Sequence, residues 1–330
     1  MTRVHVVGAA GYAASEVVRL LHAHPHATLG AIESESHAGQ RVGDHAPLLR
    51  RIPRTFDGPG VALAACAPGD LVVLGGRAAD APANAAAFLQ RGARVIDLSD
   101  AFRLQAHARC GDADAVYGFV ERYRDAVRPA RLVANPGCYP TATLLALWPL
   151  ADFAPGIVQL VIDAKSGVTG AGRTPATASL FAEVDEDVRA YGLGGHRHAP
   201  EIAQELRALG IDAPFVFTPH VVPLRRGMLV DAYAVFADEP DADAVRAAFA
   251  RRYAGSPFVR LLEAEQAPKL TAVAGTNDAE LHVSVAGKVV RALCAIDNLG
   301  KGAAGQVVQT LNVMLGLPEE TALHADSIAI

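Results

Sequence analysis

The sequence predicts an α/β protein with two domains, a doubly wound parallel sheet followed by a second domain of the α+β type. Its 330 residues are more than one simple core usually holds. Hydrophobic residues make up 51% of the chain and charged residues 20%, so it can bury a sizeable core. In the first part of the chain, short apolar runs alternate with helical segments, which is typical of βαβ units.

The first domain is expected to begin with a buried strand at residues 3–7, a glycine turn and an amphipathic helix with Val17, Val18, Leu20 and Leu21 on its apolar side. The Ala-rich segment DAPANAAAFLQRG is predicted to be helical. Further strands are expected at residues 27–32, 71–74 and 93–98. This order predicts a parallel sheet with crossover helices.

The pattern changes after Pro140. A helix is expected at about residues 141–150, and it leads into the apolar segment IVQLVIDAKSG. Alternating apolar and polar residues predict antiparallel strands at residues 215–217, 228–236 and 279–285. These elements predict a second, α+β domain.

The segment GAAGQVVQTLNVML near the C-terminus has helical periodicity. We expect this helix to return to the first domain and to pack on it. The first domain is therefore placed at residues 1–140 and completed by residues 301–330, and the second at residues 141–300.

The composition argues against several classes of function. The formal net charge is −5, and basic residues cluster only in LLRRIPR, so nucleic-acid binding is not expected. The N-terminus lacks the apolar core of a signal peptide, and no apolar run approaches the roughly 18 residues of a membrane span. Four scattered cysteines without a CxxC pair predict neither a disulfide framework nor a zinc knuckle. A cytoplasmic protein without metal is expected.

The segment GAAGYAASE has the features of a dinucleotide-binding, Rossmann-type loop. Gly8 permits the tight turn after the strand, Gly11 allows a pyrophosphate to approach the helix N-terminus, and Ala14 takes the third, tightly packed position. Its spacing is GxxGxxA, which also fits an ordinary turn between a strand and a helix. The location after the first strand favours a cofactor site that also includes Ala10, Tyr12 and Ala13.

Cys138 in NPGCYPTA follows a Pro-Gly turn and precedes a predicted helix. The N–H groups of a helix N-terminus favour a thiolate, which can attack an activated acyl carbon and hold the acyl group as a thioester for hydride reduction. The alternative for any isolated cysteine is a small buried apolar residue, which Cys66 and Cys294 fit. A nucleophile beside a dinucleotide site makes thioester chemistry the leading hypothesis.

The segment GGHRHAPEI supplies the histidines that could exchange a proton near neutral pH. On an extended segment, His196 and His198 would face one cleft and Arg197 would point away. The alternatives are surface histidines beside a helix and a metal site, for which a third ligand at recognisable spacing is missing.

Two further segments suit an anionic substrate. DAKSGVTGAGR combines Lys165, Ser166 and Arg173 with glycines that allow close backbone approach, although it also fits a surface hairpin loop. DLSDAFRL places Ser99 and Arg103 just beyond a strand, where ligands collect in open α/β sheets. An arginine there is equally often an ordinary surface charge.

Together with FTPHVVPLRRGML and DNLGKGAAGQ, these motifs resemble the N-acetyl-γ-glutamyl-phosphate reductase family of arginine biosynthesis, from Val4 to about Leu317. More distantly, they are similar to aspartate-semialdehyde dehydrogenases. The resemblance implies an NADPH-dependent oxidoreductase that converts an acyl phosphate to a semialdehyde, and a catalytic second domain in a homo-oligomer, dimer or tetramer. It makes Cys138 the nucleophile, with His198 as its partner and His196 in substrate binding. It also implies substrate contacts from Arg103, Ser166, Gly167 and Arg173, and cofactor contacts from Gly8, Gly11, Asn298 and Lys301.

The sequence departs from this family at two places that bear on the cofactor. Where the family often has a Ser-Arg pair for a 2′-phosphate, the chain has IESESHAG, with Glu33 and Glu35. Ser34 and Ser36 can still donate hydrogen bonds to a phosphate. The segment LVVLGGRAAD lacks a Pro-His, and we expect Arg77 to take over some cofactor contact there. NADP is expected, with NAD as the alternative.

Two other functions remain open at this point. One is the homologous reductase of lysine biosynthesis, whose aminoadipyl phosphate is one methylene longer and is bound to a carrier protein. A pocket discriminates one methylene by only about 1–3 kcal/mol, so residue types do not decide between the substrates. The other is a redox sensor that binds a dinucleotide without turnover, and the presence of Cys138, His196 and His198 together argues against it.

Overall fold

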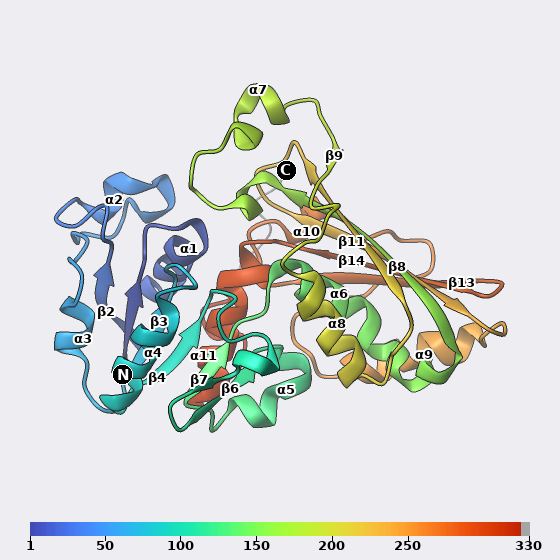
Figure 1. Cartoon of the computed structure of the whole chain (residues 1–330), viewed down its shortest axis with the longest axis horizontal. Coiled ribbons are helices and arrows are strands. Elements are labelled where there is room, and N and C mark those ends of the chain that lie inside the picture. The colour runs from blue at the N-terminus through green and yellow to red at the C-terminus, as the bar shows by residue number, and fades with distance from the viewer. Residues whose placement is uncertain (325–330) are drawn as a thin grey trace. The chain divides into compact units, whose positions relative to one another are not determined.

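The computed structural model describes residues 1–324, which separate into two units (Figure 1). The first unit contains residues 1–136 and 303–324, and the second contains residues 137–302. The last six positions of the predicted C-terminal segment, 325–330, lie outside the described residues.

The first unit is built on a seven-stranded sheet in the order β2-β1-β3-β4-β7-β6-β5. All neighbouring strands run parallel except β5 and β6, which form an antiparallel hairpin. The predicted strands are present, and three short ones were not anticipated. The strands are β1 (Thr2–Val7), β2 (Ala27–Glu33), β3 (Leu71–Leu74), β4 (Arg94–Asp97), β5 (Arg109–Cys110), β6 (Ala113–Tyr117) and β7 (Leu132–Ala134).

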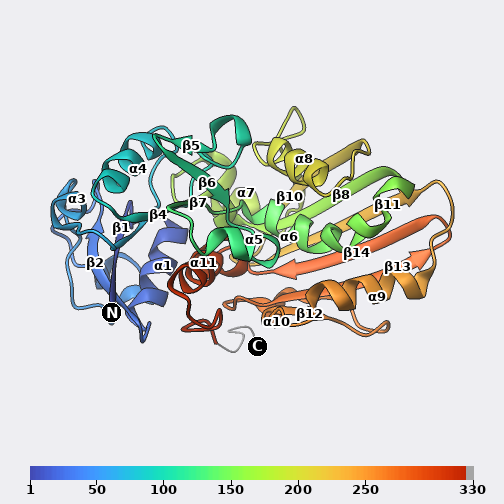
Figure 2. The same cartoon turned by 90° about the horizontal axis from the view of Figure 1, so that it is seen from below.

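Helices cover both faces of this sheet, as a doubly wound fold requires (Figure 2). On one face, α3 (Val61–Ala65) and α4 (Ala81–Gln90) bury alanines and Phe88 against the strands. On the other face, α1 (Tyr12–His22) and α5 (Val120–Val127) both pack against α11 (Gly305–Leu315). A short helix, α2 (Val42–His45), follows β2.

Helix α11 returns to the first unit, as the sequence predicted, although it carries polar residues in buried positions. Gln306 donates from Nε2 to the Gly118 carbonyl at 2.8 Å. Asn312 accepts from His24 Nε2 at 2.9 Å. Because these polar groups have partners, the helix can be buried almost all round without a large desolvation penalty.

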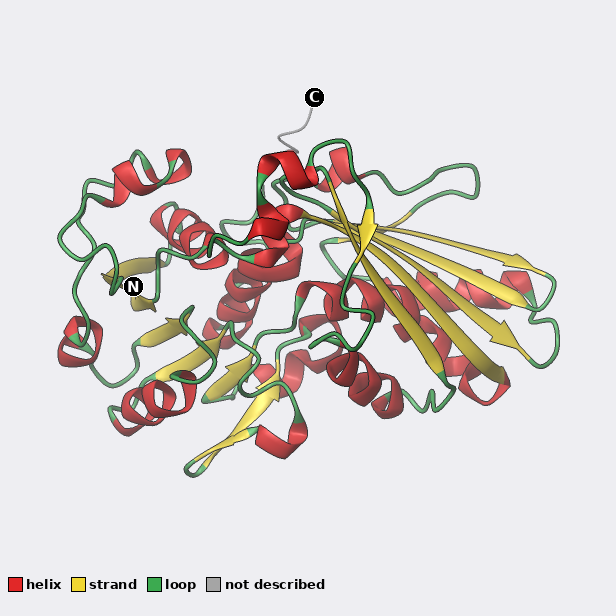
Figure 3. Ribbon diagram, turned by 45° about the horizontal axis from the view of Figure 1, so that its top comes forward, coloured by secondary structure: helices red, strands yellow, loops and turns green. Residues whose placement is uncertain are grey.

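The second unit contains a mixed sheet (Figure 3). Its seven strands have the order β12-β13-β14-β11-β8-β10-β9. The predicted strands at 228–236 and 279–285 are antiparallel to their neighbours β8 and β14. The strands are β8 (Ile157–Gly167), β9 (Arg189–Ala190), β10 (Phe215–Val222), β11 (Met228–Phe236), β12 (Val259–Leu261), β13 (Ala279–Ala286) and β14 (Val289–Ile296).

One strand of this sheet differs from the prediction. The segment at 215–217 was expected to be antiparallel, but β10 pairs in parallel with β8. The chain between the two strands passes through helix α8 (Ala199–Ala208), and a helical crossover brings the chain back in the same direction. The predicted fold class, a parallel first domain and an α+β second domain, is confirmed.

Helices of the second unit cover one face of its sheet. Helix α6 (Cys138–Leu147) contacts β11 and β14, and α9 (Ala242–Tyr253) contacts β13. In β11, every second residue from Met228 to Phe236 is buried, whereas the residues between them are partly exposed. The remaining short helices are α7 (Phe181–Val184) and α10 (Leu270–Val273). No helix within residues 1–324 combines the length and apolar character needed to span a membrane.

Candidate active site

The glycine loop lies between β1 and α1, as predicted. Gly8 has φ +75°, and a Cβ there would lie 2.6 Å from the Gly76 nitrogen. Ala14 packs against Gly75, where a Cβ would lie 2.6 Å from that of Ala14. At Gly11, by contrast, a Cβ would make only ordinary van der Waals contacts, the nearest being the Gly8 carbonyl oxygen at 3.9 Å. A loop of this shape can accept a pyrophosphate against the first N–H groups of α1.

Gly8→Ala is expected to lower the stability of the protein by at least about 2 kcal/mol, because it combines a strained φ with a clash. Gly39 has a similar φ of +79°, but a Cβ there would meet nothing within 4 Å. Gly39→Ala should therefore cost only about 1 kcal/mol. Thermal unfolding of both variants checks this expectation, and equal losses would show that the contact with Gly76 is not tight.

The side chains expected near the cofactor, at the end of β2 and after β3, differ in exposure: Glu33 and Ser34 are buried, whereas Glu35, Ser36 and Arg77 are exposed. The Glu33 carboxylate accepts the Ala62 N–H at 2.5 Å and so stabilises the start of α3. Burial raises the pKa of Glu33. Glu35 is exposed, and Ser36 Oγ lies 2.8 Å from His37 Nδ1. Arg77 is exposed too and forms an ion pair with Asp80.

Cys138 is the first residue of α6, so its thiol lies at a helix N-terminus. Gly137 has the extended conformation of an N-cap residue, and its N–H donates to Glu201 Oε1 at 2.9 Å. Gly302 packs directly on the cysteine, because a Cβ at Gly302 would lie 2.8 Å from the Cys138 Cβ. The turn before Cys138 is thus fixed from two sides, and the helix N-terminus favours the thiolate.

The two predicted histidines lie together beside α6, although their backbone is not the expected extended segment. His198 is helical at φ −84° and ψ −14°, because it is the N-cap of α8. The rings of His196 and His198 are 4.9 Å apart, and both contact the ring of Tyr139 edge to face. Arg197 is exposed. The turn into α8 therefore gathers the rings on one side.

Hydrogen bonding gives the two histidines different properties. The His198 backbone N–H donates to His196 Nδ1 at 3.1 Å, so that nitrogen carries no proton and His196 is a neutral Nε2–H donor. Burial, and to a smaller extent the charge of Arg197, lowers the pKa of His196. The His198 side chain is 2% exposed.

Two tyrosines complete this cluster. The Tyr191 hydroxyl donates to the Tyr139 hydroxyl at 3.1 Å, and the Tyr139 hydroxyl donates to the His220 carbonyl at 3.2 Å. Burial raises the pKa of Tyr139, and the charge of Cys138 acts in the same direction. Both phenols therefore remain neutral around the thiol.

The predicted substrate residues are divided between the units. Ser166 and Gly167 are buried at the end of β8, where a Cβ at Gly167 would lie 2.8 Å from the Leu224 carbonyl oxygen, and Arg173 is half-buried in the following loop. Lys165 faces the opposite side of the strand and pairs with Asp163 and Asp231. Arg103 belongs to the first unit, where its guanidinium donates to the carbonyls of Asn135 and Leu98.

Asn298 and Lys301, both predicted to contact the cofactor, lie in the second unit. Asn298 accepts the Gly227 N–H at 2.8 Å and donates to Thr169 Oγ1 at 3.0 Å, so its amide holds two loops together. Lys301 is fully buried, with Nζ 5.7 Å from the centre of the Phe258 ring.

Two supporting carboxylates were missed by the sequence analysis. Asp297 accepts the N–H groups of Leu299 and Gly300 and pairs with Arg226, which fixes the turn that carries Gly302. Glu201 holds the Gly137 N–H. An aspartate followed by a glycine-containing turn is a local sequence signal for the role of Asp297. The role of Glu201 has no local signal, because its partner Gly137 is 64 positions away.

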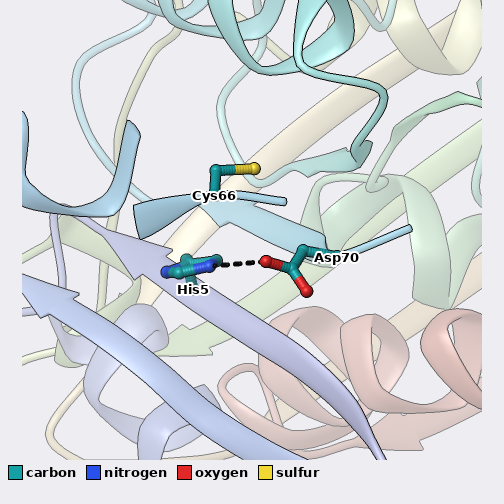
Figure 4. Close-up of side chains that lie close together, drawn as sticks. All are labelled: His5, Cys66 and Asp70. Atoms are coloured by element: carbon teal, nitrogen blue, oxygen red, sulfur yellow. Dashed lines mark hydrogen bonds and ion pairs between the residues drawn. The ribbon is translucent and has the colours of Figure 1, made fainter. Parts of the chain in front are cut away.

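Among residues 1–324, one trio brings metal-ligating atoms within 4.8 Å of one another, namely His5, Cys66 and Asp70 (Figure 4). The Ala31 N–H donates to His5 Nδ1 at 3.0 Å, so the ring proton lies on Nε2 and is donated to Asp70 Oδ2. Binding a metal through Nε2 would move this proton to Nδ1, towards the Ala31 N–H. Burial raises the pKa of Cys66, which disfavours the thiolate. The trio fits a buried His–Asp hydrogen bond rather than a metal site.

Comparisons with known proteins cover nearly the whole chain. The model of the semialdehyde dehydrogenase NAD binding domain matches residues 3–130, and that of the semialdehyde dehydrogenase dimerisation domain matches residues 138–298. The chain is 41% identical to the N-acetyl-gamma-glutamyl-phosphate reductase of Bordetella bronchiseptica, over 99% of this chain and 97% of that protein. It is 43% identical to the protein of the same name from Pseudomonas entomophila, over 98% and 99%.

Solved structures share the fold at low sequence identity. Aspartate semialdehyde dehydrogenase II from Vibrio cholerae, complexed with ASA, superposes with a TM-score of 0.74 at 17% identity, covering 96% of this chain and 98% of that one. The aspartate semialdehyde dehydrogenase with NADP from Candida albicans gives a TM-score of 0.68 at 14% identity, with the same coverage.

Proposed function

The chain belongs to the N-acetyl-γ-glutamyl-phosphate reductase family, and from this premise we propose that it reduces N-acetyl-γ-glutamyl phosphate to N-acetylglutamate semialdehyde and phosphate. The observation that carries the proposal is the cluster at the start of α6, where Cys138 lies at the helix N-terminus and the rings of two histidines of different character contact the ring of the next residue, Tyr139. This arrangement suits nucleophilic attack on an acyl phosphate. We place the reaction in the cytoplasm, as part of arginine biosynthesis.

In the proposed mechanism, the Cys138 thiolate attacks the acyl carbon, the bond to the phosphate oxygen breaks, and phosphate leaves with the bonding electron pair. The product is a thioester on Cys138. A bound nicotinamide dinucleotide supplies the hydride that reduces this thioester. The oxyanion that hydride addition leaves takes up one proton to give a thiohemiacetal, and loss of the same proton then breaks the C–S bond, which releases the aldehyde and restores the thiolate.

We assign proton transfer in these steps to His198 and substrate binding to His196. A neutral His196 with its proton on Nε2 donates a hydrogen bond but has no second nitrogen available as a base, because Nδ1 already accepts from the backbone. Ser166, Gly167 and Arg173 are proposed to bind the rest of the substrate. Arg103 keeps its proposed substrate role, with its guanidinium oriented by two backbone carbonyls.

The reverse reaction tests the proposed function. The protein is incubated with phosphate, either NADP⁺ or NAD⁺, and either N-acetylglutamate semialdehyde or the carrier-bound aminoadipate semialdehyde of lysine biosynthesis. Formation of NADPH with the acetylated substrate, at a kcat/KM at least tenfold higher than with the carrier-bound one, is expected. Preference for the carrier-bound substrate would assign the chain to the lysine route, and no reaction with either would favour a non-catalytic sensor.

We further propose that the dinucleotide is NADPH. Gly8, Ala10, Gly11, Tyr12 and Ala13 form the loop suited to its pyrophosphate. Ser34 and Ser36 are proposed to receive the 2′-phosphate, while Arg77, Asn298 and Lys301 keep their proposed roles near the cofactor. Because the Glu33 carboxylate is held at α3, Glu35 is the acidic side chain of this turn that opposes a 2′-phosphate.

Glu35→Arg is expected to raise kcat/KM for NADPH by roughly three- to tenfold, since it replaces a repelling charge at an exposed position with an attracting one. The value for NADH should change little, because NADH has no 2′-phosphate. Steady-state rates with both coenzymes measure this, and Glu35→Gln separates loss of repulsion from gain of attraction. A wild-type kcat/KM tenfold higher for NADH, about 1.4 kcal/mol in transition-state binding, would contradict the assignment of NADPH.

We also propose that the chain forms a homo-oligomer, dimer or tetramer, through its second unit. The family model that matches residues 138–298 describes a dimerisation domain. The side of the sheet that the helices leave uncovered carries partly exposed apolar residues of β11, and Val216 of β10, on the same side, is 53% exposed. Sedimentation should therefore give a mass of at least twice the 34.4 kDa of one chain, and a single-chain mass would refute this.

A further inference from the structure

Helices α6 and α8 lie side by side in the second unit (Figure 1), and two contacts of different kinds join their starts. One is a link to the backbone, because the Glu201 carboxylate in the first turn of α8 accepts the Gly137 N–H just before Cys138. The other joins side chains, because the Tyr139 ring in α6 meets the ring of His198, the N-cap of α8, with 5.9 Å between the centroids. The first contact fixes the two helix starts relative to each other, whereas the second acts on the imidazole itself.

The Tyr139 ring is held at both ends. Its Cα belongs to the second residue of α6, and its hydroxyl donates to the His220 carbonyl at 3.2 Å and accepts from the Tyr191 hydroxyl at 3.1 Å. The side chain is buried, and the Phe217 ring packs against it edge to face at 5.4 Å between the centroids. A ring fixed in this way has little freedom to rotate, so it acts as a rigid wall for its neighbours.

His196 has supports that do not depend on Tyr139. Its Nδ1 accepts the backbone N–H of residue 198, and its ring also meets the rings of Tyr191 and Phe217, each with 5.5 Å between the centroids. Removal of the Tyr139 ring should therefore leave His196 close to its present orientation. The same change opens space beside the buried ring of His198.

We propose that Tyr139 is a positioning residue, whose ring holds the His198 imidazole in the orientation needed for proton transfer. Acid–base catalysis requires the transferring nitrogen to lie within hydrogen-bond reach of the reacting group, so a rotated imidazole loses rate even though its own chemistry is unchanged. Because Tyr139 directly follows Cys138, the nucleophile and this ring are carried by the same helical turn. The inference rests on the proposed function, since it concerns the proton carrier of that reaction.

The test compares Tyr139→Leu with Tyr139→Phe. Leucine removes the aromatic ring and fills part of its space, whereas phenylalanine keeps the ring and loses only the hydroxyl. In Tyr139→Leu, kcat of the reverse reaction should fall by roughly 10²-fold, with the KM of the semialdehyde within about threefold of wild type, because His196 is assigned to substrate binding. In Tyr139→Phe, kcat should recover to within about fivefold of wild type. Tyr139→Met, whose flexible side chain fills more of the space, gives the same comparison if the leucine variant does not fold.

A second measurement needs no turnover. Diethyl pyrocarbonate modifies accessible neutral imidazoles, and trypsin separates the two histidines into the peptides AYGLGGHR and HAPEIAQELR, so mass spectrometry follows each one alone. The rate of modification at His198 should rise by roughly fivefold or more in Tyr139→Leu, because the imidazole is no longer enclosed, and should stay near the wild-type rate in Tyr139→Phe. The rate at His196 should change by less than about twofold in either variant.

Tyr253→Leu is the matched control. Tyr253 is a buried tyrosine of the same unit that also packs on α6, where its hydroxyl donates to the Leu145 carbonyl at 2.6 Å. This variant should lose thermal stability, as Tyr139→Leu does, but keep kcat and the wild-type rate of modification at His198. An equal loss of kcat in Tyr253→Leu or in Tyr139→Phe would refute positioning by the ring, and so would an unchanged kcat in Tyr139→Leu.

Failure of the proposed function gives a different result. If the wild-type protein does not turn over the semialdehyde, the assignment to proton transfer fails together with the proposed function. The modification rates then still decide whether the Tyr139 ring encloses His198. Equal rates at His198 in wild type and Tyr139→Leu would refute that contact, whatever reaction the protein performs.

Discussion

Cys138→Ser is expected to lower kcat by at least about 10⁴-fold, because a serine hydroxyl stays un-ionised near neutral pH and is a far weaker nucleophile than a thiolate. The fold and the binding of the dinucleotide should be retained. Serine is only slightly smaller than cysteine, and the residue lies at the first position of α6, where its backbone N–H has no intrahelical partner to lose. Steady-state rates, thermal unfolding and nucleotide binding of the same preparation separate these effects.

The other cysteines provide the control. Cys66, Cys110 and Cys294 are 6%, 8% and 0% exposed, and burial raises the pKa of Cys66 and of Cys110. Iodoacetamide should therefore react first with Cys138, and Cys110→Ser should retain wild-type kcat. A Cys138→Ser enzyme with most of the wild-type kcat would exclude the thioester mechanism, whereas an equal loss in Cys110→Ser would point to instability.

Local patterns predicted the parts of the fold whose contacts are close in the sequence. The turn from β1 through Gly8 into α1 is such a part, because strand, glycine and amphipathic helix follow one another directly. Strand β7 (Leu132–Ala134) was missed because three apolar residues leave too short a pattern, although it is an interior strand of the sheet. The parallel direction of β10 depends on the crossover through α8, which periodicity does not reveal.

The same limit applies to the candidate site. The sequence identified Cys138, His196 and His198 by residue type and spacing, but it placed the histidines on an extended segment. It could not indicate that the Glu33 carboxylate binds at α3, since its partner Ala62 is 29 positions away. The contact of Gly302 with Cys138 likewise joins residues from the two ends of the second unit. Such contacts are set by tertiary packing, for which one sequence carries no periodic signal.

Replacing His198 by asparagine is expected to lower kcat by roughly 10²–10⁴-fold, the usual contribution of a general acid–base group. Asparagine keeps hydrogen-bonding capacity in similar space but does not exchange a proton. His196→Asn should instead raise KM more than it lowers kcat, because His196 is assigned to substrate binding. The backbone N–H of residue 198 donates to His196 Nδ1, and His198→Asn keeps this N–H. The substitution therefore need not disturb the orientation of His196.

The pH profile distinguishes proton transfer from a merely structural role. If His198 transfers the proton, wild-type kcat should have a pH-dependent limb that reports the ionisation of this group. That limb should disappear in His198→Asn, and the KM of the substrate should change little. His196→Asn should keep that limb. The reverse pattern, with the limb lost in His196→Asn, would exchange the two roles. Near-wild-type kinetics in both variants would mean that neither imidazole takes part, and the thiol at the start of α6 would then need another proton carrier.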